Sequence, residues 1–262
     1  MSRKNPGSGA RTAAIEGDWR GMYVAGGVAA LLALAGTLAD IIVAMLPGWE
    51  TTTTPETVQA WFVQFQTNPL LGLRNLDLLN VVISAIGIPM YLALYGIHRR
   101  FAQAPAMLAL IVVLVGTVIL TASSAALPML DLSAQYASAA TDAQRLALEA
   151  AGMSLLARGA HGSMGAFMGF FVSGLGTLLM GIAMLTGRVF GRVTAWLAIA
   201  GTTLLIAYSI GVAFTPIPVE NLVVLAMLGG LPMMAWNVIV ARRLLRMAAV
   251  DGGGARRARG EA

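Results

Sequence analysis

The sequence contains no cysteine and few charged residues, and each shortage excludes a class of protein. Without cysteine, the 262-residue chain has neither disulfides nor thiolate metal sites. Charged residues make up only 11% of the chain and hydrophobic residues 58%, whereas soluble domains carry about 25% charged residues. Water is therefore not the main solvent of this protein.

Lysine and histidine are also scarce, which argues against a Schiff base within a span and against haem bound by two histidines. Lys4 is the only lysine, so no apolar segment contains a lysine that could form a Schiff base. The two histidines, His98 and His161, fall at opposite ends of apolar segments, about 30 Å apart, which argues against a haem bound by both. Hydrolase, metalloprotease and phosphate-loop motifs are missing. The sequence thus predicts no catalytic residue, no metal site, no cofactor and no enzymatic activity.

Apolar residues occur in six blocks, each long enough to cross a membrane as a helix. A span needs about 20 residues, and the six blocks cover residues 22–46, 70–97, 106–130, 162–186, 193–215 and 221–245. The predicted fold class is all-α, a polytopic membrane bundle of six transmembrane helices. Residues 1–20 would form a basic arm and 21–247 the membrane domain, with 248–262 as a disordered tail rich in glycine and charge.

Basic residues are distributed unevenly along the chain, which predicts the orientation. If the chain crosses six times, most of them fall on one side, namely Arg3, Lys4, Arg11, Arg20, Arg99, Arg100, Arg188, Arg192, Arg242, Arg243, Arg246, Arg256, Arg257 and Arg259. Cytoplasmic loops carry such an excess, so both termini are expected in the cytoplasm. The basic balance then reflects topology and not nucleic-acid binding. The Arg rim would attract anionic membrane lipid.

Two connections on the outer side are predicted to form amphipathic helices on the outer face of the bundle. In the first, Thr54 could cap a helix beginning at Pro55, with an apolar stripe directed toward the lipid interface and formed by Val58, Trp61, Phe62 and Phe65. The second begins with a capping box of Thr141 and Gln144 and should remain helical to about Arg158.

Polar residues gather near the outer ends of the predicted spans. Asp40 lies in the first span, and a charge at such a depth is costly unless it meets a partner or water. We expect it to share one level with other polar residues in a candidate outer pocket, consisting of Asp40, Arg74, Asp77, Asn80, Asp131 and His161. With the second helix starting at Pro69, Arg74, Asp77, Asn80 and Ser84 would share one helix face.

Two interpretations of this cluster stay open at the level of sequence. In the first, Asp40 or Asp77 forms a salt bridge with Arg74 that only braces the helices. In the second, the cluster forms a pocket for a small molecule, an ion or a lipid head group. Substituting Asp40 should separate the two interpretations, because a brace affects stability and a pocket affects binding.

The fourth span carries small residues at every fourth position, which is typical of close helix packing in membranes. The predicted packing ridge consists of Gly165, Gly169, Ser173, Thr177 and Gly181.

The segments "GGVAALLALAGTLADIIVAMLP", "LDLLNVVISAIGIPMYLALYGIHRR" and "GLGTLLMGIAMLTGRVFGRVTAWLAIAG" resemble a family of bacterial six-helix membrane proteins, the domain-of-unknown-function family number four-three-eight-six. The resemblance covers roughly residues 22–246 and lies in hydropathy, helix order and a few polar positions. The chain departs from the family pattern in having no acid in the third span. The resemblance implies an integral protein of the bacterial cell (cytoplasmic) membrane and implies no activity.

The sequence supports three functional hypotheses. The first is a non-enzymatic binding or structural membrane protein with a polar pocket in the outer leaflet half, for a lipid or small amphiphile. The second is a small secondary transporter coupled to protons or cations through Asp40 and Asp77. The third is a membrane-embedded enzyme. Membrane lipids are the expected partners, nucleic acid is not, and assembly into a homo-oligomer stays open.

Overall fold

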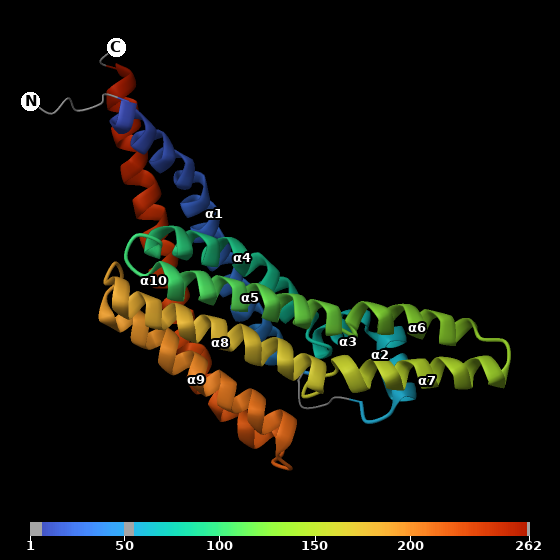
Figure 1. Cartoon of the computed structure of the whole chain (residues 1–262). Coiled ribbons are helices and arrows are strands. Elements are labelled where there is room, and N and C mark those ends of the chain that lie inside the picture. Colours follow the sequence, from blue (N-terminus) through green and yellow to red (C-terminus); the bar gives the residue numbers. More distant parts are fainter. Residues whose placement is uncertain (1–6, 50–54, 261–262) are drawn as a thin grey trace, which may run out of the picture.

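A computed structural model describes residues 7–49 and 55–260, and the side chains of 19–49, 55–219 and 221–249. The secondary structure of this part of the chain is entirely helical (Figure 1). Its helices are α1 (Gly7–Ala44), α2 (Val58–Thr67), α3 (Pro69–Asn75), α4 (Leu78–His98), α5 (Gln103–Ser123), α6 (Ala126–Ser138), α7 (Asp142–Gly159), α8 (Met164–Gly187), α9 (Arg192–Phe214) and α10 (Val219–Gly260).

Six of the described helical stretches are long and apolar enough to cross a membrane, and they lie in α1, in α4, in α5 with α6, in α7 with α8, in α9 and in α10. This confirms the prediction of a multi-span, all-helical membrane protein. The orientation of the bundle and the identity of the membrane stay predictions from the charge pattern.

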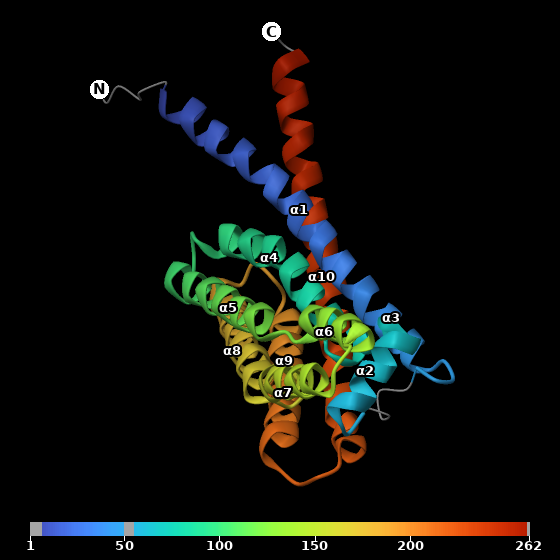
Figure 2. The same ribbon diagram turned by 90° about the vertical axis from the view of Figure 1, so that its right-hand side faces the viewer.

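The six long helices form a closed ring. They pack in the order α1, α4, α5, α8, α9 and α10, and α10 returns to α1, while α4 and α8 also meet across the ring. Figure 2 shows how α1 and α10 cross and then diverge. The crossing lies at Gly27, where an added Cβ would be 2.7 Å from Leu245 Cγ.

Small residues determine where neighbouring helices of the ring meet, because the backbones can approach only there. A Cβ added to Gly26 of α1 would lie 2.6 Å from the Cβ of Ala93 on α4. Gly201 of α9 faces Gly229 of α10, and a Cβ on Gly201 would lie 2.9 Å from the Gly229 carbonyl oxygen. The glycines therefore fix the seams of the ring.

The four shorter helices α2, α3, α6 and α7 form a cap at one end of the ring, and the start of α1 and the end of α10 lie at the other end (Figures 1 and 2). We call these the cap end and the terminal end. The cap has a hydrophobic core of its own, in which Phe62 is fully buried and its ring lies 4.8 Å from the ring of Tyr136. Ser133 Oγ donates a hydrogen bond of 3.0 Å to the Phe62 carbonyl oxygen.

The cap corrects the prediction that α2 turns its aromatic stripe toward lipid. All four stripe residues, Val58, Trp61, Phe62 and Phe65, are at most 5% exposed. They pack against α6 and α7 and against Leu76, because these elements present an apolar surface to α2. An amphipathic stripe alone does not show whether it faces lipid or protein. The stripe predicted the helix correctly and its environment wrongly.

The N-capping residues of α2 and α7 agree in part with those predicted from the sequence. Thr141 and Gln144 form the predicted capping box at the start of α7, which ends at Gly159. Helix α2 begins at Val58, three residues later than predicted, because Thr57 Oγ1 accepts a hydrogen bond from the Ala60 amide nitrogen. Thr54, the cap predicted from the sequence, lies outside the described residues.

The second predicted span, residues 70–97, is two helices and not one. Helix α3 ends at Asn75, Asp77 adopts a left-handed conformation with φ of 59°, and α4 starts at Leu78. The break separates Arg74 from Asn80, so these residues do not share the helix face that a continuous helix would have given them. Leu76 is 1% exposed in the core of the cap, which favours the turn over a straight helix.

The third predicted span, residues 106–130, is interrupted by a break between two helices and lies within a longer candidate span, Gln103–Ser138. Helix α5 ends at Ser123, and α6 begins at Ala126 and continues into the cap. Pro128 explains the interruption, because its ring would clash with the carbonyl group of Ser124, four residues earlier.

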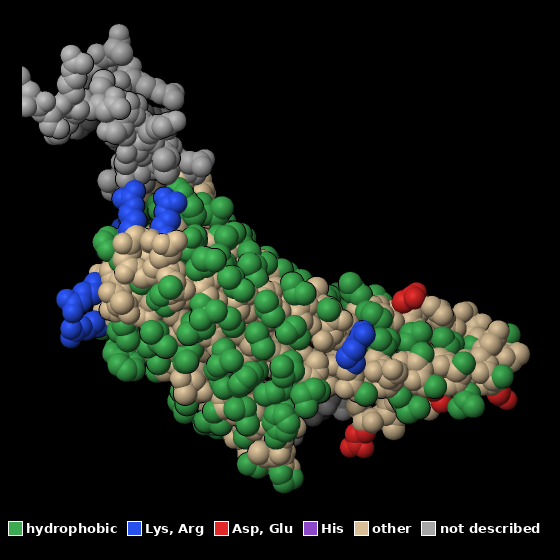
Figure 3. Space-filling model, viewed as in Figure 1, with side chains coloured by type: hydrophobic (Ala, Val, Ile, Leu, Met, Phe, Trp, Pro, Cys, Tyr) green, Lys and Arg blue, Asp and Glu red, His purple; other side chains and the backbone are tan. Residues whose placement is uncertain are grey.

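Charged side chains are separated along the length of the molecule. Of the Arg side chains visible in Figure 3, most lie near the terminal end, whereas Asp and Glu lie on the cap and an apolar surface lies between them. This separation is the one that the sequence pattern predicted.

Helix α10 continues to Gly260 through much of the predicted disordered tail, since extending an existing helix requires no new nucleation. Residues 261 and 262 lie outside the described part.

Candidate functional site: a cavity inside the helix ring

The helix ring encloses a cavity of about 370 Å³, lined by residues from all six long helices and by the turn between α7 and α8. Gly87 of α4 shows that this space is real. It is buried, yet a Cβ added to it would have no neighbour within 4 Å, unlike those on the glycines at the seams. The volume lies within the range of pockets that hold small molecules, about 300–1,000 Å³.

The cavity runs from the cap end of the ring to about the middle of the bundle. Along α4 it extends from Asn80 to Tyr91, which corresponds to about 16 Å of helix. At the inner end, the Tyr91 hydroxyl lies 2.6 Å from Thr177 Oγ1, and the ring of Tyr91 packs against Trp236. Beyond this point the bundle is filled by fully buried side chains, among them Leu94, Met180, Met184, Val240 and Leu244.

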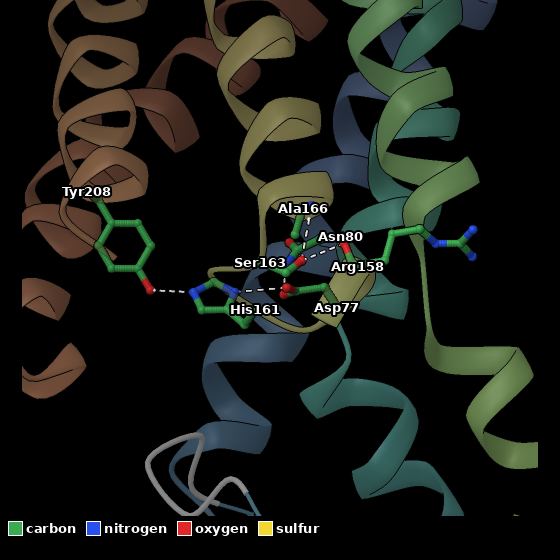
Figure 4. A network of polar contacts seen from close by, with 7 residues as sticks. All are labelled: Asp77, Asn80, Arg158, His161, Ser163, Ala166 and Tyr208. Carbon is green, nitrogen blue, oxygen red and sulfur yellow. Dashed lines mark hydrogen bonds and ion pairs between the residues drawn. The ribbon is translucent and has the colours of Figure 1, made fainter. Parts of the chain in front are cut away.

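Polar groups gather at the mouth of the cavity in a chain of hydrogen bonds (Figure 4). Asp77 Oδ2 lies 2.8 Å from His161 Nδ1, and His161 Nε2 lies 2.9 Å from the hydroxyl of Tyr208. Asn80 Nδ2 donates a hydrogen bond of 2.9 Å to the second oxygen of Asp77. The side chain of Arg158 is directed away from this network.

Local backbone features hold the two sides of the network in place. On one side, the left-handed turn at Asp77 directs its carboxylate toward the start of α8, and Asn80 fixes that carboxylate. On the other side, Gly162 has φ of 80° and packs against Val212 of α9, which brings His161 next to Tyr208. Asp, like Asn, tolerates the left-handed region better than most residues. Such positions cluster at functional sites.

The chemistry of Asp77 determines the role of His161 Nδ1 in the network. An ionised carboxylate can only accept hydrogen bonds, so His161 Nδ1 must carry a hydrogen atom. The contact between His161 Nε2 and the Tyr208 hydroxyl has two possible directions: a neutral imidazole accepts from the hydroxyl, and a charged imidazolium donates to it. The Asp77 side chain is 13% exposed and that of His161 32% exposed, so histidine faces the open space and the carboxylate supports it from behind.

Asp40 and Arg74 form a separate interaction. Arg74 Nε donates to Asp40 Oδ1 at 2.7 Å, and another Arg74 nitrogen donates to the Trp49 carbonyl oxygen at 2.6 Å. The Arg74 side chain is 8% exposed and that of Asp40 34% exposed. The contact joins α1 to α3 and to the residues after α1. Neither side chain lines the cavity, so the geometry matches the bracing interpretation of this pair.

The structure therefore divides the predicted pocket of six residues. Asn80 and His161 line the cavity, Asp77 lies directly behind His161, and the Asp40–Arg74 pair lies apart. Asp131 does not join them, which corrects the prediction. It lies on α6, accepts a hydrogen bond of 2.9 Å from Gln135 of the same helix, and is carried into the cap by the early end of α5.

Sequence reasoning missed the residues that complete the site. Tyr208 lies within the fifth predicted span and Asn237 within the sixth, and neither was predicted as a site residue. Both line the cavity. The available signal was a polar side chain inside an apolar helix, which is rare without a role. The buried Oδ1 atom of Asn237 has no hydrogen-bond partner among the described residues, so one acceptor is unused near the inner end.

Successive residues of the predicted packing ridge on α8 contact three different helices, α5, α4 and α9. Added Cβ atoms at Gly165 and Gly169 would lie 2.7 Å from atoms of Ser123 and Leu120 on α5, and one at Gly181 would contact Ala198 on α9. Each step of four residues turns the row by about 40° around the helix. The row therefore rotates from α5 past the ring centre, where Thr177 meets Tyr91 of α4, to α9.

Nothing in the described side chains brings three or more His, Asp or Glu residues together as a metal site would require. No protein-family model, no curated protein and no solved structure matches this chain. The family resemblance therefore stays a prediction, and the fold and the site rest on the chain's own geometry.

Proposed function

We propose that this protein is a non-enzymatic binding protein that holds one lipid or small amphiphile within the membrane. The polar head of the ligand would lie at the mouth, beside His161 and Tyr208. Its apolar part would occupy the cavity down to Tyr91 and Trp236. The charge pattern predicts that the mouth lies in the outer leaflet half of the cell membrane.

The observation that carries this proposal is the distribution of polarity along the cavity. Its mouth holds a hydrogen-bonded network of Asp77, His161 and Tyr208. Its walls are largely apolar, with Met90, Val113, Phe167 and Leu205 among the lining residues. This arrangement of one polar end and an apolar channel complements a molecule that has a head and a chain.

The driving force in a membrane differs from that in water. An alkyl chain gains no hydrophobic free energy when it moves from lipid into the cavity, because both surroundings are apolar. It makes dispersion contacts with the apolar walls of the cavity. Hydrogen bonds between the head group and the mouth would supply selectivity.

The inner end of the cavity favours binding over transport. The hydrogen bond between Tyr91 and Thr177 closes the cavity, and the packed side chains beyond it occupy the rest of the ring. A transporter would need a second conformation in which these contacts separate. The transporter hypothesis rests on no specific contact among the described residues.

Quenching of Trp236 fluorescence tests the proposal. Trp236 is 1% exposed and lines the cavity, so surrounding lipid cannot reach its ring. In a variant whose other tryptophans are replaced by phenylalanine, we expect 12-bromododecan-1-ol in nanodiscs to quench Trp236 in a saturable manner. Gly87→Leu, which fills the cavity, should abolish the quenching.

The matched control is Gly21→Leu. A Cβ at Gly21 also has no neighbour within 4 Å, but Gly21 is exposed on α1 and does not line the cavity. Saturable quenching should persist in this control. Quenching that is absent in the parent protein, or equal in Gly87→Leu and Gly21→Leu, would refute the proposed function.

A further inference from the structure

We infer that the ligand of this cavity is an amphiphile with two polar ends, whose buried end carries an uncharged oxygen that accepts a hydrogen bond from Trp236. This inference rests on the proposed binding function and adds the chemistry of the buried end of the ligand. It follows from polar atoms near the inner end of the cavity that have no partner among the described residues.

Trp236 supplies the donor for this oxygen. Its side chain is 1% exposed and lines the cavity, and its Nε1 atom is buried without a hydrogen-bond partner among the described residues. An indole nitrogen carries a hydrogen and can only donate, so the direction of any hydrogen bond that it makes is fixed. A buried donor without an acceptor costs free energy, and an oxygen of the ligand would remove that cost.

Asn237, the next residue of α10, adds a second unused polar atom. It also lines the cavity, and its buried Oδ1 atom has no partner among the described residues. A flip of the amide exchanges its oxygen and nitrogen, so this position offers an acceptor in one orientation and a donor in the other. Asn237 therefore accommodates a hydroxyl or an ether oxygen beside Trp236.

The buried Oγ atom of Ser173 on α8 also has no partner among the described residues. It lies against Gly116 of α5, where an added Cβ would meet both this oxygen and the Ser173 amide nitrogen. The hydroxyl is thus directed into the seam between two helices. A hydroxyl can also donate or accept, so Ser173 does not determine the chemistry of the ligand as Trp236 does.

The shape and charge of the cavity describe the rest of the ligand. The cavity follows α4 for about 16 Å, from Asn80 at the mouth to Tyr91, whose ring lies 6.2 Å from the ring of Trp236. The walls between these ends are largely apolar. The described lining contains no Lys, Arg, Asp or Glu, so a charged group at the buried end would have no counter-charge. The ligand is therefore an apolar chain with an uncharged oxygen at its buried end.

Three probes with a twelve-carbon chain share a hydroxyl for the mouth and differ at the other end. Dodecane-1,12-diol carries a second hydroxyl, 12-methoxydodecan-1-ol carries an oxygen without a hydrogen, and dodecan-1-ol carries no second polar group. Radiolabelled probe retained by protein-loaded nanodiscs is measured against empty nanodiscs, which corrects for partition into lipid. We expect the first two probes to bind about tenfold more tightly than dodecan-1-ol, because each satisfies the Trp236 donor.

Trp236→Phe removes the donor and keeps an aromatic ring. We expect this variant to bind the three probes equally. Trp61→Phe is the matched control, because Trp61 is 5% exposed in the core of the cap and does not line the cavity. It should retain the tenfold preference.

The indole N–H resonance reports the hydrogen bond directly, including the case in which Trp236→Phe fails to fold. In a variant whose only tryptophan is Trp236, labelled with nitrogen-15, the two probes with a second oxygen should shift the N–H proton downfield relative to dodecan-1-ol. A water molecule bound to Nε1 in place of the ligand would make the shift equal for all three probes, which would overturn the inference.

The outcomes distinguish the inference from the function beneath it. If all three probes bind equally to the parent protein and Gly87→Leu abolishes their binding, the cavity is a binding site and the inference of a second polar end is wrong. The inference is also wrong if Trp236→Phe folds and keeps the preference. If the parent protein retains no probe, or if Gly87→Leu retains them all, the proposed function fails together with the inference.

Discussion

Asp77 and His161 are 84 positions apart in the sequence, and their side chains meet at 2.8 Å at the mouth of the cavity. The contact joins the start of α4 to the turn before α8. It also orients His161 toward Tyr208 of α9. One hydrogen-bonded network thereby joins three parts of the ring.

The Asp40–Arg74 pair should brace the protein without taking part in binding. Asp40→Asn removes the charge that Arg74 meets, and we expect it to lower the free energy of unfolding by about 1–2 kcal/mol, since Asp40 is one-third exposed. Thermal melting in nanodiscs measures this. Asp131→Asn, where the carboxylate accepts a hydrogen bond from Gln135 of the same helix, should stay within about 0.5 kcal/mol of the parent protein. Normal melting combined with weakened quenching of Trp236 by 12-bromododecan-1-ol in Asp40→Asn would contradict the bracing role.

The left-handed turn at Asp77 predicts a difference between two substitutions. Asp77→Asn keeps a residue that tolerates φ of 59°, whereas Asp77→Ala adds steric strain of about 1 kcal/mol to the loss of the carboxylate. Comparing the melting temperatures of the two variants tests this. Equal melting temperatures would mean that the backbone at this position is not strained.

Phe62 tests whether α2 packs on protein or on lipid. Phe62→Ala should lower the free energy of unfolding by about 3–5 kcal/mol, because the fully buried ring leaves a cavity in the core of the cap. The neighbouring Val63 is 56% exposed, and Val63→Ala should change stability by less than about 0.5 kcal/mol. A small and similar effect of both substitutions, followed by thermal melting, would place the aromatic face in lipid.

Two glycines should respond oppositely to the same substitution. A Cβ at Gly169 would lie 2.7 Å from the Leu120 Cα, so Gly169→Ala must push α5 and α8 apart at a cost of about 1–3 kcal/mol. Gly87→Ala places its methyl group in the cavity and should be neutral or stabilising. If Gly87→Ala melts as low as Gly169→Ala, the space beside Gly87 is not open.

The helices could be predicted from sequence because local patterns determine them. Runs of apolar residues identified the six spans, and the Thr141–Gln144 capping box marked the start of α7. The break at Asp77 could not be predicted in this way. Its left-handed conformation depends on Leu76, buried in the cap, and on His161, far away in the chain.

The candidate site could be predicted only in part, because some of its features are local in the sequence and others depend on helix packing. Asp77, Asn80 and His161 were recognised as polar residues near the ends of spans, and the structure brings them together. Tyr208 and the empty space beside Gly87 depend on the packing order of the ring. Nothing local in the sequence encodes which helices are neighbours, so the cavity itself could not be predicted.

Native mass spectrometry of the purified protein, released from nanodiscs, tests the central claim most directly. We predict one bound molecule with the mass of a lipid or small amphiphile on the parent protein and on Gly21→Leu, and none on Gly87→Leu. A parent protein that carries no such molecule, or a Gly87→Leu variant that carries it to the same extent, would contradict the assignment of the helix ring as a binding site.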